Sequence, residues 1–131
     1  MVVLTFIVGA LVLFTRVSEM RKKRIHPQAA ATSVQVSARL EMVQPSDNFK
    51  NLFEIPVLFY TLMAIAVSNN QVPSWLVVCA WLFVALRFLH SLIHCTYNKV
   101  YHRLAAFMAG FGLLVGMWCY YFLSIVLKSA A

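Results

Sequence analysis

The sequence predicts an all-α membrane protein, a single domain of residues 1–131 in which four transmembrane helices form a bundle. Hydrophobic residues make up 62% and charged residues 11% of the chain, whereas a soluble domain has about 45–50% and about 25%. The apolar residues form four runs, each close to the roughly 17–25 residues that a helix needs to cross a bilayer. The basic residues, which give a net charge of +7, gather at the ends of these runs. That placement is typical of membrane topology signals, so we expect no nucleic-acid partner.

The four apolar runs predict transmembrane spans at about residues 1–17, 49–67, 74–95 and 104–127. The first run has neither a positively charged start nor a small-residue cleavage site, so we expect a span rather than a cleaved signal peptide. Residues 18–48 form a long first connection, and its small and polar middle shows no helical period. We therefore expect a surface loop over residues 21–37. The basic quartet at its start is expected to lie against anionic lipid headgroups.

The three connections between the spans differ in charge. The first has Lys or Arg at positions 16, 21–24, 39 and 50, the third has Lys99 and Arg103, and residues 68–74 carry no charge. Positively charged connections stay on the cytoplasmic side of a membrane. We therefore expect the first and third connections in the cytoplasm and both chain termini outside.

The second span contains a carboxylate, Glu54. A charge inside a membrane segment is costly, so it faces protein or water and has a partner. The expected partner is Arg87, which interrupts the third apolar run. Asn51 and Glu54 are three residues apart and so share one helix face. Pro56 follows, and a proline beyond the first turn of a helix kinks it and frees a carbonyl group.

The third span places Arg87, His90 and His94 at positions i, i+3 and i+7, which lie on one helix face. Together with the polar face of the second span, they predict a polar pocket that opens toward the cytoplasm. Two other interpretations stay open: Glu54 and Arg87 fix the register of the helices, or the two histidines are hydrogen-bonded interface residues. The histidine spacing also occurs on zinc-binding helices, but the HExxH pattern is missing, and we predict no metal site.

Small residues form a stripe along the fourth span, at positions 105, 109, 112 and 116. Such stripes allow close approach of transmembrane helices. Because four short spans leave little interior space, we expect an oligomer with the polar site between subunits.

Four short spans, the long first connection and the Asn-x-x-Glu-x-Pro run of residues 51–56 resemble the MAPEG family, the membrane-associated proteins in eicosanoid and glutathione metabolism. The similarity covers nearly the whole chain and is clearest over residues 48–60 and 87–110. The stretch from Arg87 to Arg103 resembles the bacterial branch, which implies a bacterial inner membrane. The resemblance also implies a homotrimer that binds glutathione between subunits on the cytoplasmic side and acts on lipophilic electrophiles or peroxides.

The resemblance implies roles for particular residues. Asn51 and Glu54 match the family's glutathione-binding Asn and Glu, and Arg103 lies near the arginine that stabilises the thiolate, which makes it the catalytic candidate. Arg87, His90 and His94 complete the expected contacts with glutathione.

Two departures from the family pattern keep a second function open. Asp47 stands where the family's glutathione transferases have an arginine, and the two histidines stand where they have tyrosines. The sequence therefore favours two hypotheses about equally. One is a glutathione- or thiol-dependent transferase or peroxidase with a lipophilic small-molecule substrate. The other is a non-catalytic membrane scaffold, an accessory subunit of a larger membrane complex, or a lipid-binding protein.

Overall fold

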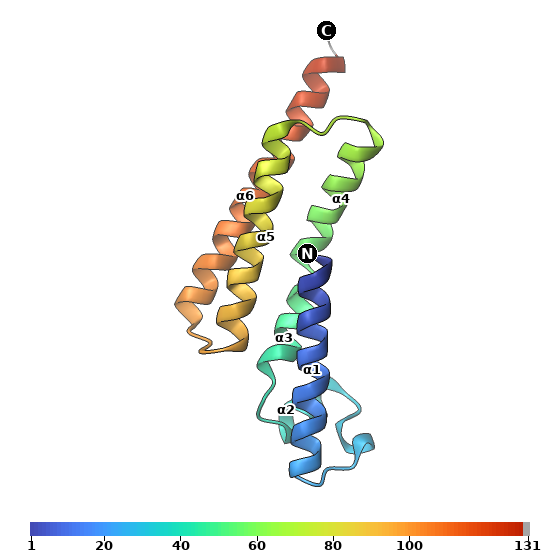
Figure 1. Ribbon diagram of the computed structural model, residues 1–131, viewed down its shortest axis with the longest axis vertical. Helices are drawn as coiled ribbons and strands as arrows, with labels where there is room; N and C mark the ends of the chain where they lie inside the picture. Colours follow the sequence, from blue (N-terminus) through green and yellow to red (C-terminus); the bar gives the residue numbers. More distant parts are fainter. Residues whose placement is uncertain (130–131) are drawn as a thin grey trace.

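The computed structural model describes residues 1–129 and consists of helices joined by short connections (Figure 1). Their bounds are α1 Val2–Lys22, the 3-10 helix η1 Pro27–Ala30, α2 Ser33–Arg39, α3 Gln44–Asn51, α4 Ile55–Ser68, α5 Ser74–Cys95 and α6 Val100–Ser129. Four stretches are long and apolar enough to cross a membrane: Val2–Lys22, Gln44–Ser68, Ser74–Cys95 and Val100–Leu127. The predicted four-span, all-α fold class is confirmed.

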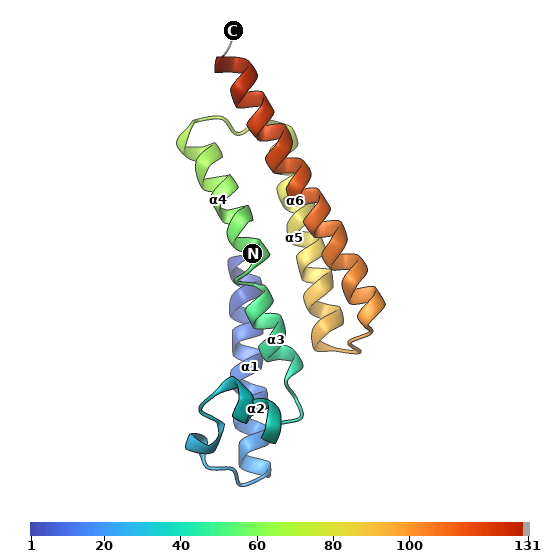
Figure 2. The same cartoon turned by 180° about the vertical axis from the view of Figure 1, so that it is seen from behind.

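The principal core lies between α5 and α6, which run side by side as an antiparallel hairpin, with α4 adding apolar side chains from the second span (Figures 1 and 2). The side chains that form this core are fully or almost fully buried: Phe59, Leu62, Ala66, Leu76, Phe83, Leu114, Met117 and Tyr121. The ring of Phe59 stacks on that of Phe83 at a centroid distance of 4.7 Å. This packing fixes the hairpin that carries most of the polar residues discussed below.

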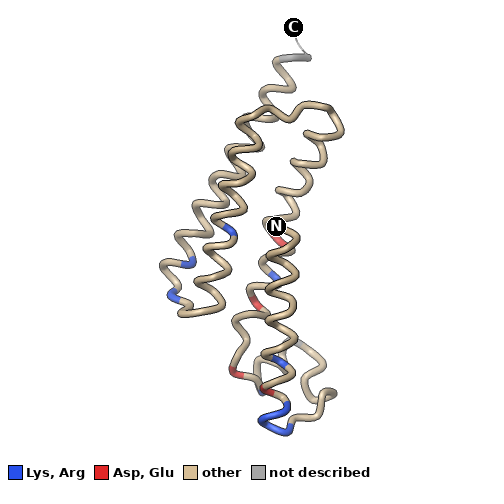
Figure 3. The backbone as a smooth tube through the Cα atoms, in the orientation of Figure 1, with Lys and Arg blue, Asp and Glu red and all other residues tan. Residues whose placement is uncertain are grey.

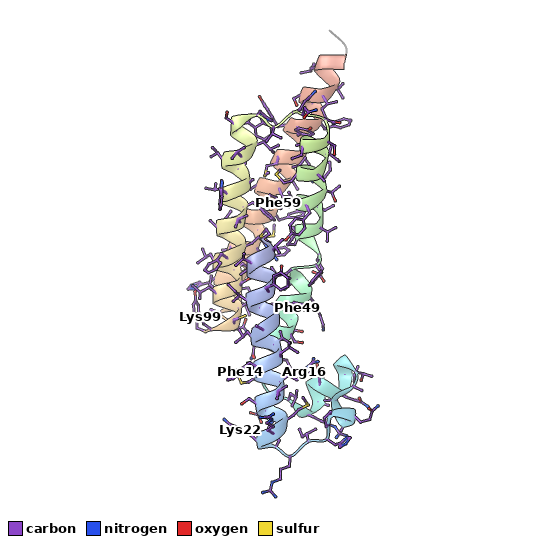
Figure 4. All side chains as sticks on the ribbon, turned by 45° about the vertical axis from the view of Figure 1, so that its right-hand side comes forward. Phe14, Arg16, Lys22, Phe49, Phe59 and Lys99 are labelled. Carbon is purple, nitrogen blue, oxygen red and sulfur yellow. The ribbon has the colours of Figure 1, made fainter. Side chains whose placement is uncertain are left out.

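The first helix packs against α3 rather than along the whole bundle. Leu4 and Val8 of α1 form a small buried cluster with Leu52. Met1 lines a pocket together with Phe59 and Val84, which lie midway along α4 and α5. At its other end α1 extends past the α5–α6 turn, as the positions of Lys22 and Lys99 in Figure 4 show. The helix is therefore displaced along the bundle axis.

The segment expected to be a surface loop contains two short helices. The second of them, α2, begins with a capping box: Thr32 Oγ1 accepts a hydrogen bond from Gln35 N, and Gln35 Oε1 accepts one from Thr32 N. The expectation of a surface loop over residues 21–37 is therefore wrong at its start, where α1 continues to Lys22, at Pro27–Ala30, and from Ser33 onward. The reason is that a helix of only seven residues depends on good capping rather than on a long apolar period. The Thr-x-x-Gln spacing was the signal in the sequence.

A buried carboxylate holds this segment to α1. Glu19 accepts hydrogen bonds from the backbone N–H groups of Glu41, at 2.7 Å, and Met42, at 3.1 Å. Lys23 forms 2.8 Å ion pairs with both Glu19 and Glu41. The hydrogen bonds from Lys23 to these two carboxylates raise the pKa of its ammonium group. This arrangement fixes where the chain enters α3, which bears several residues of the candidate site.

The charged residues are distributed unevenly along the molecule. Figure 3 shows Lys and Arg around the α5–α6 turn and along the lower part of α1, whereas the α4–α5 turn at the opposite end carries none. The two basic connections therefore lie toward the same end of the bundle.

The contact between α1 and α3 depends on the small size of Gly9. A Cβ atom at this position would lie 3.1 Å from Cε2 of Phe49, which is tighter than an ordinary van der Waals contact. We expect Gly9→Leu to lower the free energy of unfolding by about 1–3 kcal/mol, because overpacking forces neighbouring side chains or backbone to move. Thermal or denaturant unfolding of the detergent-solubilised protein measures this loss.

Ala10→Leu is the matched control for Gly9→Leu. Ala10 is the next residue of the same helix and is exposed, and it lines the open groove beside Phe49, so a leucine at this position has room that Gly9 lacks. Equal stability of the two variants would contradict the close approach of α1 to Phe49.

Candidate functional site

The second span is broken between α3 and α4, at residues 52–54. Pro56 lies in the first turn of α4. A proline lacks the backbone N–H, and its ring clashes with the carbonyl group four residues earlier, so the helix cannot continue through this point. Nη2 of Arg87 donates a 3.1 Å hydrogen bond to the carbonyl oxygen of Asn51, the last residue of α3. The arginine therefore satisfies a carbonyl group at the helix end, which needs a partner inside a membrane.

Arg87 itself is almost completely enclosed, with 1% of its surface exposed. Its guanidinium carbon lies 5.7 Å from the centroid of the Phe107 ring, a cation–π contact. Arg87 thus joins α3, α5 and α6 at one point.

A second polar contact between α3 and α5 is centred on Asn48, which is completely buried. Its Oδ1 accepts a hydrogen bond from Ser91 Oγ at 3.3 Å, and its Nδ2 donates to Cys95 Sγ at 3.4 Å. Sequence analysis missed this residue. The available signal was its position three residues before Asn51, which places both on one face of α3.

The two histidines predicted for the site lie together on α5. Both are buried, and their ring centroids are 5.7 Å apart. Nδ1 of His90 lies 3.1 Å from the carbonyl oxygen of Arg103, which links α5 to the first turn of α6. In the described part of the chain, His90 Nε2 and His94 Nδ1 are buried without a hydrogen-bond partner. Such unpartnered buried atoms are uncommon and require an explanation.

Arg103 is half-buried in the first turn of α6. Its Nη1 donates a 3.0 Å hydrogen bond to Oδ1 of Asn98. Asn98 lies in the α5–α6 turn with a φ of 46°, a left-handed conformation that asparagine tolerates better than most residues. The turn therefore positions the side chain that holds Arg103.

These elements enclose one pocket of about 310 Å³ between α3, α5 and the start of α6. Four of the six predicted site residues line it: Asn51, His90, His94 and Arg103. The remaining lining residues are Asp47, Val100, Leu104 and Phe107. Hydrogen-bond donors, an acidic residue and an aromatic ring therefore meet in a single pocket, at the end of the bundle where the basic connections lie.

Comparison with known families identifies the chain. Residues 1–123 match the sequence model of the MAPEG family. The protein belongs to the MAPEG family. Comparison with curated proteins and with solved structures found no match. Membership establishes an integral membrane protein of the MAPEG type, and it agrees with the four membrane-length helices.

Two predicted residues of this MAPEG protein lie outside the pocket lining. Arg87 does not line the pocket, but it donates a hydrogen bond to the carbonyl group of Asn51, which does. Glu54 is exposed, and among the described residues it forms no ion pair with Arg87. The expected ion pair between the two side chains is therefore absent within one chain, and the same contact across a subunit interface stays a prediction. The physical reason is the helix break, since residues three apart share a face only where the helix is continuous.

The pocket also contains residues that sequence analysis did not assign to the site. Asp47 was noted only as a departure from the MAPEG pattern, yet it lines the pocket and lies 3.6 Å from Lys50. Phe107 was read as part of an apolar run, and it contacts both His90 and Arg87. Its position one turn after Arg103 on α6 was the signal in the sequence.

Proposed function

We propose that this MAPEG protein is a thiol-dependent enzyme, a transferase or peroxidase, that uses glutathione against lipophilic electrophiles. The observation that supports the proposal is the convergence of Arg103, Asn51 and the two histidines on one pocket. The alternative, a non-catalytic scaffold, does not require these groups to face a common space.

The chemistry of the pocket suits the functional groups of glutathione. Arg103 supplies a fixed positive charge, which favours the thiolate form of a nearby thiol. Asp47 and Lys50 offer a carboxylate and an ammonium group beside each other, which match the ammonium and carboxylate groups of an amino acid. Asn51 can donate and accept hydrogen bonds. When bound, glutathione supplies the nucleophilic sulfur.

We also propose the orientation and assembly that this function needs. We place the basic end of the bundle in the cytoplasm of a bacterial cell and the chain in the inner membrane. The pocket then faces the cytoplasm, where it can take up glutathione, and the C-terminal end of α6 lies outside. The stripe of Ala105, Ala109, Gly112 and Gly116 is exposed, and nothing lies within 4 Å of a Cβ atom built at either glycine. This stripe supports contact with a second copy, as in a homotrimer.

Calorimetric titration of the detergent-solubilised protein with glutathione tests the proposal. We expect saturable binding in the wild type and about 10- to 150-fold weaker binding in Asn51→Ala, because a hydrogen bond to a charged ligand contributes about 1.5–3 kcal/mol. The bond from Arg87 uses the main-chain carbonyl of Asn51, so this variant keeps it.

Asn69→Ala makes the same chemical change at the exposed α4–α5 turn, at the opposite end of the bundle, and is expected to bind like the wild type. Absence of any binding heat at millimolar glutathione in the wild type would count against the enzyme and favour the scaffold.

A further inference from the structure

The hydrogen bond of His90 determines which of its ring nitrogens carries a proton. Nδ1 lies 3.1 Å from the carbonyl oxygen of Arg103. A carbonyl oxygen has no proton to donate, so Nδ1 must be the donor and bear the hydrogen. In a neutral imidazole the other nitrogen then has a free lone pair and acts as an acceptor. His90 therefore presents Nε2 as a base.

This Nε2 atom has no partner among the described residues. His90 is 2% exposed and lines the pocket, so water does not reach the lone pair freely. Arg87 donates from Nη2 to the Asn51 carbonyl, while its Nε is also buried without a partner, and Arg103 donates from Nη1 to Asn98. No hydrogen bond joins either arginine to His90 Nε2 in the part of the chain that the structure describes. A buried acceptor without a donor is expected to receive one from a ligand.

We propose that Nε2 of His90 is the proton acceptor of this site, taking the proton of a thiol bound in the pocket. The inference rests on the proposed thiol-dependent function and adds a residue role to it. The S–H bond breaks, its electron pair stays on sulfur beside Arg103, and a new N–H bond forms at Nε2. The proton on Nε2 is then available to the oxygen atom of the electrophile.

Arg103 has two separate roles in this arrangement, one for its backbone and one for its side chain. Its backbone carbonyl orients the His90 ring, and its guanidinium lies in the pocket as the positive charge. A nucleophile activated by a base that a third group orients is a recurring design in enzymes. Replacing the Arg103 side chain leaves the carbonyl in place, so the two contributions can be separated by mutation.

His90→Gln tests the role, because a glutamine amide can still donate to the Arg103 carbonyl but has no basic nitrogen. We expect the dissociation constant for glutathione to rise by no more than about tenfold, the effect of losing one hydrogen bond, while turnover falls about 100- to 10,000-fold, the usual contribution of a general base. His102→Gln is the control. His102 is exposed, contacts the Tyr97 hydroxyl and lies outside the pocket.

Nitrogen NMR of the histidine-labelled protein gives a readout that does not depend on turnover. His90 should show a protonated Nδ1 and an unprotonated Nε2 without ligand, and Nε2 should gain a proton when glutathione is added. If His90→Gln does not fold, the signal is assigned by removing the other three histidines in turn.

The base role of His90 and the thiol-dependent function of the protein can fail separately. Wild-type turnover in His90→Gln, or a neutral His90 with its proton on Nε2, overturns the base role and leaves the enzyme proposal standing. A wild-type protein that binds no thiol overturns the proposed function and this role with it.

Discussion

Replacing Arg103 by alanine is expected to abolish thiol-dependent turnover while the fold and the assembly stay intact. The guanidinium is the positive charge that lines the pocket, and removing one preorganised electrostatic group lowers the catalytic rate about 100- to 1,000-fold. The structural loss is small, because Arg103 is half-buried and its side chain donates a hydrogen bond to Asn98, which lies in a turn. Steady-state rates, together with the ultraviolet absorbance of the bound thiolate, measure the effect.

Lys99→Ala is the matched control for this experiment. Lys99 precedes α6, carries the same charge and is exposed outside the pocket lining. Its loss should leave both the rate and the thiolate absorbance near their wild-type values. If Arg103→Ala instead dissociates the oligomer, or if it turns over normally, the residue serves as a membrane-surface anchor and the enzyme proposal loses its main support.

Replacing Arg87 by alanine should cause the largest loss of stability of any single change considered. The side chain is 1% exposed and fills the space between α3, α5 and α6. Truncating a large buried side chain costs about 3–5 kcal/mol, and the Asn51 carbonyl group is left without its donor. Unfolding of the solubilised protein, followed by circular dichroism, measures the change.

Arg87→Met separates the volume of the side chain from its charge. Methionine refills most of the space and removes the desolvation cost of a buried cation, so this variant should lose less stability than Arg87→Ala. Arg21→Ala, at an exposed position in the last turn of α1, controls for the loss of one positive charge. A change of less than about 0.5 kcal/mol in Arg87→Ala, the range of ordinary surface substitutions, would contradict the packing described for Arg87.

The sequence predicted well wherever one uninterrupted helix carries the pattern. Arg87, His90 and His94 share a face of α5 as their spacing indicates, and α5 has the bounds expected from its apolar run. Whereas Arg103 was predicted through the family resemblance, the four spans follow from hydrophobic length, and the shared face of the α5 residues follows from helical period. Such features depend on contacts within one helix or on composition, which a single sequence contains.

The failures lie where the helix is interrupted or where the contact is between distant segments. Glu54 was placed on the face of Asn51, but the break before Pro56 removes that relation. Asn48 acts through Ser91 and Cys95, which are more than forty residues away along the chain, and no local pattern reports such a pairing. Asp47 was judged by family comparison alone, because its approach to α5 and α6 is a property of the folded chain.

The break at residues 52–54 also has a mechanical consequence. It separates α3, a rod of eight residues, from α4. Asn51 and Asp47 lie four residues apart on this rod, about 6 Å along a helix axis, and both line the pocket. Arg87 holds the Asn51 carbonyl group, and Asn48, between the two, is hydrogen-bonded to Ser91 and Cys95. This wall of the pocket is therefore held in place by contacts between α3 and α5, and it does not depend on a continuous helix through α4.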